Sequence, residues 1–257
     1  TPFAAPAEGV VSLPGSKSHT NRALLCAALS EGTSRLSGVL FADDTEAMLK
    51  AIVSLGATVE EDRKNFEIEV TGLAGAPMFR DLVIDAKLSG TTSRFLLPTL
   101  AAGKGEVTLD GAPQLRSRPF AEQIEALRNL GCDLEELGTP GGLPIKLASR
   151  GLEGGEVEIS AETSSQFVSG LMLAAPLYPS GLKIRLVGPP VSRPYLNRTI
   201  KVMRDFGVSV DEPDGLTYIV PPGRYLAADL RIEPDASAAS YFFANSLPLS
   251  NVSLSQV

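Results

Sequence analysis

The sequence is poor in the residues from which soft-metal and redox sites are built. Its 257 residues include one histidine and two cysteines, Cys26 and Cys132, which lie far apart and among apolar residues. The chain therefore offers almost no ligands for a His/Cys metal site, and we expect no metal and no cofactor. Single cysteines in apolar surroundings predict reduced thiols inside a core, which fits a cytoplasmic protein.

Long apolar runs and excess positive charge are also missing. No stretch approaches the roughly 18 uncharged apolar residues of a membrane span, and the first residues do not read as a secretion signal. The net charge of −7 argues against a nucleic-acid-binding surface. We therefore expect no nucleic-acid partner and no membrane. The length predicts one large domain or two modest ones.

What the sequence does contain is an internal repeat of about 75 residues. An amphipathic stretch ends three times in a glycine, at Gly56, Gly131 and Gly207, which are 75 and 76 positions apart. Apolar residues seven, four and one position before each glycine form one helical stripe, which predicts a buried face and a left-handed glycine stop. Alternating apolar residues after each glycine predict a half-buried strand.

A second type of helix recurs at the same interval. It is entered through hydroxyl and glycine residues, near Ser16, Gly90, Ser165 and Asp235, and is then apolar nearly all round. Such helices are expected to lie buried inside a domain. Pro98 is expected to kink the second helix or to place its start later. The repeat therefore predicts an α/β fold of three units around shared buried helices, followed by an incomplete fourth unit that indicates a fragment.

The entries of the first three helices, at 16–22, 89–94 and 163–166, predict an anion site. If the repeats are related by rotation, these N-termini point to a common side, each with unpaired N–H groups and about half a positive charge. The nearby basic side chains are Lys17, Arg22, Arg94 and Arg118. Serine and threonine at one helix start are usually only caps, so it is their recurrence that favours a site.

Other readings of these stretches are weaker. A Walker-type nucleotide loop needs glycine directly before the lysine, and Ser16 stands there, so we reject it. His19 is expected on the helix surface rather than as a base. The two cysteines are at core positions and do not resemble activated nucleophiles.

These stretches resemble the 5-enolpyruvylshikimate-3-phosphate synthase family of enolpyruvyl transferases. The shared motifs cover essentially the whole chain: "LPGSKSHTNRALL", "SGTTSR", "RSRP", "SSQFVSGLMLAAP", "SRPY" and "PDASAASYF". The resemblance implies an inverse α/β barrel, in which each of two domains has three repeated units and parallel buried helices facing a cleft. It implies that residues 1–14 open the second domain, residues 15–232 form the first, and residues 233–257 begin a truncated second domain.

The resemblance also implies a reaction and a set of binding residues. The family transfers the enolpyruvyl group of phosphoenolpyruvate to the 5-hydroxyl of shikimate 3-phosphate and releases phosphate, without a metal. Lys17 is the implied catalytic residue and contacts both substrates. The residues implied for shikimate 3-phosphate are Lys17, Ser18, Arg22, Ser164, Ser165, Gln166, Ser192 and Tyr195. Those implied for phosphoenolpyruvate are Lys17, Gly90, Arg118 and Gln166.

Two departures from the family pattern affect these expectations. Leu88 stands where many members have asparagine, which removes one polar contact. The general-base aspartate and several cations of the family belong to the part of the second domain that is absent here. We therefore expect this chain alone to bind shikimate 3-phosphate weakly and to turn over negligibly, with a complementing second-domain chain as its partner.

Two alternatives stay open. One is the related transferase that acts on UDP-N-acetylglucosamine, which Lys17–Ser18 disfavours because that relative carries lysine–asparagine there and a loop cysteine. The other is a non-catalytic complementing or binding fragment.

Overall fold

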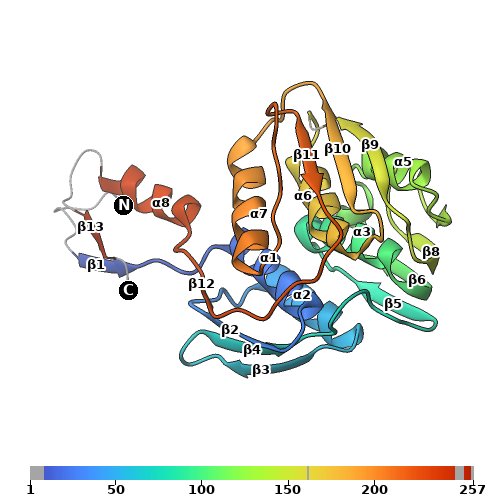
Figure 1. Cartoon of the computed structure of the whole chain (residues 1–257). Coiled ribbons are helices and arrows are strands. Elements are labelled where there is room, and N and C mark those ends of the chain that lie inside the picture. The colour runs from blue at the N-terminus through green and yellow to red at the C-terminus, as the bar shows by residue number, and fades with distance from the viewer. Residues whose placement is uncertain (1–8, 161, 247–251, 256–257) are drawn as a thin grey trace.

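The computed structural model describes residues 9–160, 162–246 and 252–255. Three α/β units form the main body, and a smaller unit lies apart from it, joined by two extended segments (Figure 1). The first unit contains α1 (Lys17–Leu29), β2 (Thr33–Ser37), α2 (Asp43–Ser54), β3 (Thr58–Asp62) and β4 (Glu67–Thr71). The second contains β5 (Leu82–Asp85), α3 (Gly90–Ala102), β6 (Lys104–Asp110), α4 (Pro113–Arg116), α5 (Ala121–Asn129), β7 (Leu134–Glu136) and β8 (Ile145–Arg150).

The remaining elements complete the third unit and the smaller unit. The third unit contains β9 (Gly155–Ser160), α6 (Ser165–Ala174), the short 3₁₀ helix η1 (Ala175–Leu177), β10 (Leu182–Val187), α7 (Arg193–Asp205) and β11 (Thr217–Val220). The strand β12 (Leu230–Arg231) follows it, and the smaller unit consists of β1 (Gly9–Ser12), α8 (Ala236–Ser246) and β13 (Val252–Ser255).

Each unit of the main body builds its own sheet on the same plan. The strand orders are β12-β2-β4-β3, β5-β6-β8-β7 and β11-β10-β9. In each sheet the strand after the buried helix (β2, β6 or β10) has one parallel neighbour (β12, β5 or β9) and one antiparallel neighbour (β4, β8 or β11). In the described residues the first unit has no leading strand of its own, and β12 supplies it from the far end of the main body. The predicted threefold α/β repeat is confirmed, and its closure depends on a contact distant in sequence.

The helix ends follow the predicted glycine pattern. Gly56, Gly131 and Gly207 have φ angles of +107°, +89° and +83°, in the left-handed region that glycine adopts without strain. The predicted strand after the third glycine is wrong, because Val208 and Val210 are buried but form no strand. Asp211 makes only an isolated bridge to Ile219.

Pro98 does not delay the start of α3, which begins at Gly90, so the expected later start is wrong, while the expected kink stays a prediction. Proline has no N–H, and therefore cannot donate the helical bond to the carbonyl of Arg94 four residues earlier. The side-chain amide of Gln123, on α5, donates to that oxygen instead at 2.8 Å. The buried carbonyl of Arg94, which lacks its helical hydrogen bond, therefore accepts one from a side chain of a neighbouring helix.

The smaller unit pairs the two ends of the described chain. Strand β1 runs parallel to β13, with Gly9 opposite Val252. The expectation that its helix α8 is buried is wrong for the described residues, because Tyr241 is 77% exposed and Phe243 is 53% exposed. The assignment of this unit to a second domain stays a prediction.

Candidate functional site

A cavity of about 570 Å³ lies where the N-termini of α1, α3 and α6 meet. The three predicted helix entries therefore do face a common side. All ten residues with a predicted role line this cavity: Lys17, Ser18, Arg22, Gly90, Arg118, Ser164, Ser165, Gln166, Ser192 and Tyr195. Sequence reasoning missed Asp44 and Thr91, which also line it. We call this cavity the cleft.

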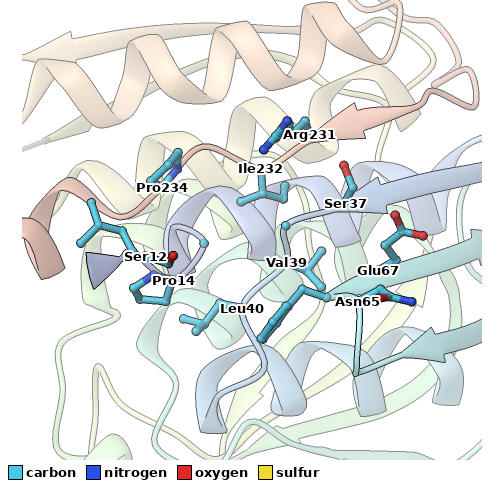
Figure 2. Close-up of a pocket in the computed structure, with 14 residues that line it drawn as sticks. Ser12, Pro14, Ser37, Val39, Leu40, Asn65, Glu67, Arg231, Ile232 and Pro234 are labelled. Carbon is cyan, nitrogen blue, oxygen red and sulfur yellow. The ribbon is translucent and has the colours of Figure 1, made fainter. Parts of the chain in front are cut away.

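A second cavity, of about 640 Å³, lies beside the two connecting segments (Figure 2). Its lining is largely apolar and includes Leu13, Pro14, Val39, Phe66 and Ile232. None of the predicted site residues lines it. The larger cavity is therefore not the predicted site.

Arg22 is the most deeply buried cation of the cleft, with 1% of its surface exposed. Its hydrogen-bond acceptors are neutral oxygens: Thr199 Oγ1 at 2.7 Å, Ser18 O at 2.8 Å, Ser169 Oγ at 3.3 Å and Tyr195 O at 3.4 Å. Its guanidinium also lies over the ring of Phe95, 4.8 Å from the centroid. Burial, with a smaller contribution from the charge of Arg198, lowers its pKa to about 9, so it stays charged at neutral pH. A buried cation without a carboxylate partner among the described residues is costly and favours an anion beside it.

Arg94 holds the side chain of Gln166 in place. Its guanidinium lies near the rings of Phe120 and Phe167, 5.3 Å and 4.9 Å from their centroids. Its Nη1 donates to Gln166 Oε1 at 2.8 Å, and Gln166 Nε2 donates to Thr91 Oγ1 at 3.1 Å. Burial lowers the pKa of Arg94 to about 10. Hydrogen bonds therefore hold both the oxygen and the nitrogen of the Gln166 side-chain amide, in the first turn of α6.

Lys17 forms an ion pair with Asp44, which the sequence analysis did not assign to the site. Its Nζ lies 2.7 Å from Asp44 Oδ2, and its side chain is about half exposed. Burial would raise the pKa of Asp44, but hydrogen bonds from Lys17 and Ser89 and the charges of Lys17 and Arg118 outweigh it, so the pKa is lowered. Asp44 is therefore ionised at neutral pH. No short-range pattern links position 17 with position 44, so the tertiary fold alone reveals this pair.

Gly90 lets a cation approach the start of α3. A Cβ atom at this position would lie 3.0 Å from Arg118 Nη1 and 3.6 Å from Arg94 Nη1, so a side chain here would compete with both guanidinium groups. The missing side chain therefore keeps the N-terminus of α3 open beside Arg118.

The serines of the cleft differ in what they already do. Ser164 Oγ accepts a hydrogen bond from Gln166 N at 3.2 Å and so caps α6. Ser192, at the start of α7, makes no capping bond with its side chain. Hydroxyls that are not used for capping remain available to a bound ligand.

The single histidine and the two cysteines lie in the interior. His19 is 1% exposed, so the expectation that it lies on the helix surface is wrong. Burial raises the pKa of Cys26 and of Cys132 to about 12, which confirms that neither is an activated thiolate. Among the described residues, no group of three or more His, Cys, Asp and Glu is placed to hold a metal ion. No helix in the described part of the chain is long and apolar enough to cross a membrane.

Comparison with known families agrees with this arrangement. The family model described as EPSP synthase (3-phosphoshikimate 1-carboxyvinyltransferase) matches residues 4–252. The chain belongs to the EPSP synthase family.

Relatives within the family support this assignment. The 3-phosphoshikimate 1-carboxyvinyltransferase of Vibrio atlanticus is 41% identical over 240 residues, which cover 92% of this chain and 56% of the relative. That of Aliivibrio fischeri (strain MJ11) is 40% identical over 240 residues, with the same coverage of both chains. The chain thus spans little more than half the length of these EPSP synthase relatives.

Solved structures show the same fold. The EPSP synthase of Acinetobacter baumannii superposes with a TM-score of 0.84 at 25% identity, over 98% of this chain and 56% of that one. The enolpyruvyl transferase NikO of Streptomyces tendae has a TM-score of 0.73 at 16% identity, over 98% of this chain and 58% of that one, and shows a likeness in fold alone.

Proposed function

We propose that this chain forms the shikimate-3-phosphate-binding half of a 3-phosphoshikimate 1-carboxyvinyltransferase. The observation that carries the proposal is Arg22, a buried cation without a carboxylate partner in the described structure, set where three helix N-termini meet. Oriented N–H groups and a desolvated guanidinium suit a phosphate or carboxylate and suit a neutral ligand poorly. Shikimate 3-phosphate carries both kinds of anion.

The cleft divides between the two substrates. In this proposal Ser18, Arg22 and the α6 entry bind shikimate 3-phosphate, together with Ser192 and Tyr195. Gly90 and Arg118 face phosphoenolpyruvate, and Lys17 and Gln166 lie between the two subsites. The bond from Arg94 and the bond to Thr91 orient Gln166 before any ligand arrives, which reduces the cost of ordering it.

The reaction adds the 5-hydroxyl of shikimate 3-phosphate to C2 of phosphoenolpyruvate while C3 is protonated, and then expels phosphate from the tetrahedral intermediate. Lys17, paired with the ionised Asp44, acts in this proposal as a positioned cation that stabilises charge on the phosphoenolpyruvate. Arg118 supports it from the start of α3. The proton-transfer groups that the family uses belong to the rest of its length, so we expect this chain alone to turn over negligibly.

The same proposal includes the organisation of the protein. Residues 15–232 form the substrate-binding domain, and residues 1–14 and 233–257 belong to a second domain, which a separate complementing chain would complete. We propose a cytoplasmic monomer that needs no cofactor.

Calorimetric titration of the chain with shikimate 3-phosphate tests the binding claim. Arg22→Met fills most of the same space without the charge, and should weaken binding about 10- to 100-fold, because a hydrogen bond to a charged group contributes about 1.5–3 kcal/mol. Arg224→Met is the matched control, because that arginine is 71% exposed and, within the described part of the chain, pairs only with Glu31 at 3.6 Å. Equal affinities of the native chain and Arg22→Met would refute the proposal.

Two further titrations separate the alternatives. Unphosphorylated shikimate should bind more weakly than shikimate 3-phosphate, and tighter binding of UDP-N-acetylglucosamine would favour the related transferase instead. Phosphate release by this chain alone, at the rate of a full-length family member, would contradict its role as one half of the site. Activity that appears only after adding a separately made second-domain chain would support it.

A further inference from the structure

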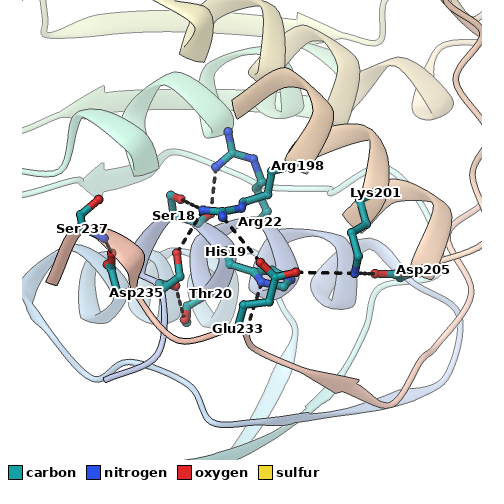
Figure 3. Close-up of polar contacts among 11 residues, drawn as sticks. Ser18, His19, Thr20, Arg22, Arg198, Lys201, Asp205, Glu233, Asp235 and Ser237 are labelled. Carbon is teal, nitrogen blue, oxygen red and sulfur yellow. Dashed lines mark hydrogen bonds and ion pairs between the residues drawn. The ribbon is translucent and has the colours of Figure 1, made fainter. Parts of the chain in front are cut away.

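Two segments join the main body to the smaller unit: one leads directly into α1, and the other passes the first turn of α1 at Glu233 (Figure 3). They are residues 13–16 and residues 232–235, which we call the outgoing and returning segments. Gly15 and Pro234 form a bridge between them, and Asp235 N–H donates to Pro14 O at 2.9 Å. The two segments therefore leave the main body together.

The peptide groups of Glu233, in the returning segment, are held at both ends by residues at the start of α1. Its carbonyl accepts a hydrogen bond from Ser16 N at 2.8 Å. Its N–H donates to His19 Nδ1 at 3.3 Å. Ser16 and His19 lie directly beside Lys17 and Ser18, so this clamp adjoins the cleft.

The side chain of Glu233 is tied to a different helix. Its carboxylate lies 3.5 Å from Arg198 Nη2 and 4.0 Å from Lys201 Nζ, both on α7. Lys201 also pairs with Asp205 at 3.1 Å, and Arg198 Nη1 lies 3.4 Å from Ser18 Oγ. These ion pairs are partly exposed and contribute little stability, so the two hydrogen bonds to the Glu233 peptide groups hold the segment. Of these two bonds, only the one to His19 depends on a titratable group.

The bond from Glu233 fixes the state of His19. A neutral imidazole has one N–H and one acceptor nitrogen, and because Nδ1 accepts, the proton is on Nε2. Nε2 is buried and has no hydrogen-bond partner among the described residues. The charged groups that face the ring are Glu233 from the returning segment, Arg198 and Lys201 from α7, and Arg22 from α1.

We propose that neutral His19 is a positioning residue that clamps the returning segment to α1, and that protonation of its ring opens the clamp. A protonated imidazole carries N–H on both nitrogens, so Nδ1–H would point at the N–H of Glu233, donor against donor. Three cations around the ring oppose the added charge and one carboxylate favours it. The clamp sets how the smaller unit is attached beside Lys17 and Ser18, whatever ligand the cleft binds.

Nuclear magnetic resonance on the native chain tests the proposal directly. His19 is the only histidine, so its ring signals need no assignment by mutation. At pH 7 we expect the Nε2–H tautomer and a slowly exchanging Glu233 amide. Burial and the surrounding cations lower the pKa of His19 to about 4, so protection of that amide should fall as the ring titrates near pH 4. An amide that keeps its protection throughout the ring titration would overturn the proposal.

A pair of variants separates the acceptor from the shape of the side chain. His19→Leu removes the acceptor, and should speed exchange of the Glu233 amide about fivefold or more relative to its buried neighbours. His19→Asn places a carbonyl oxygen near the position of Nδ1 but does not titrate, so it should restore protection and keep it below pH 4.

The Ile184 amide, in the central strand β10 of the third sheet, reports on the fold of the main body away from the clamp. Loss of Glu233 protection in His19→Asn at the same pH as in the native chain would contradict the role of the histidine. If His19→Leu does not fold, the native titration and His19→Asn still decide the question.

Discussion

Helices α3 and α8 have similar sequences and opposite surroundings. Both begin with small and hydroxyl residues and continue with apolar ones. Every residue of α3 is buried, and Phe95 is 0% exposed. In α8, Tyr241 and Phe243 are largely open to solvent, and the element it contacts most is β13.

The difference shows that an apolar pattern allows a helix to be buried but does not decide whether it is buried. Helix α3 lies against α6, with neighbouring sheets and outer helices around both. The described smaller unit offers α8 only a two-stranded sheet. A two-stranded sheet is marginally stable alone and hides one face of a helix at most, so the same kind of sequence stays exposed.

The largest expected effect comes from one substitution made in both helices. Phe95→Ala should lower the free energy of unfolding by about 3–5 kcal/mol, because it removes a fully buried ring and leaves a cavity. Phe243→Ala should change it by about 1 kcal/mol or less, since that ring is half exposed. Urea unfolding of the 257-residue chain measures both, and similar losses would show that α8 is as well packed as α3.

Where the main body joins the smaller unit, at His19, we expect the free energy of unfolding to depend on pH. The pKa of His19 is about 4 when folded and 6.5 in the unfolded chain, so between these values the unfolded chain binds the extra proton. Stability should therefore fall as the pH drops from 6.5 to 4, by up to about 3 kcal/mol, and should not depend on His19 above 6.5. The measurement is the free energy of unfolding of the native chain and of His19→Asn at several pH values in this range. A difference between the two proteins that stays constant with pH would exclude a buried neutral histidine.

A smaller effect tests how closely the buried helices approach. A Cβ atom at Gly170, on α6, would lie 2.2 Å from Arg94 O and 2.9 Å from Gln123 Nε2. Gly170→Ala should therefore destabilise the chain by about 1–3 kcal/mol through overpacking. Gly223→Ala is the matched control, because a Cβ atom at that position would meet nothing within 4 Å among the described residues. Equal unfolding midpoints for the two variants would show that α3 and α6 can separate without cost.

The smallest effect concerns the carbonyl of Arg94. Gln123→Leu should destabilise the native chain, because it leaves this buried oxygen without a donor. In a Pro98→Ala background the new N–H can bond the same oxygen, so the loss should shrink by about 1 kcal/mol. A double-mutant cycle of unfolding free energies gives the coupling directly. Strict additivity would mean that Gln123 stabilises the core by another contact.

Much of the main body could be predicted from local patterns. The glycine stops and the apolar stripes before them follow from helix geometry within a few residues, as Gly56 and Ile52 illustrate. The predicted strand after Gly207 does not form, because an alternating apolar pattern predicts buried side chains but does not supply a neighbouring strand to pair with. His19 was misplaced because the returning segment that covers it lies more than 200 residues away in the chain.

The repeat, the buried helices and the basic and hydroxyl residues at their entries can be predicted from residue spacing, because each depends on positions within one element. Packing of the units brings Lys17 to Asp44, Arg94 to two rings, β12 to the first sheet and Glu233 to His19. These contacts join residues that are distant in the chain, and their energies depend on burial and distance, which exist only once the units have packed together.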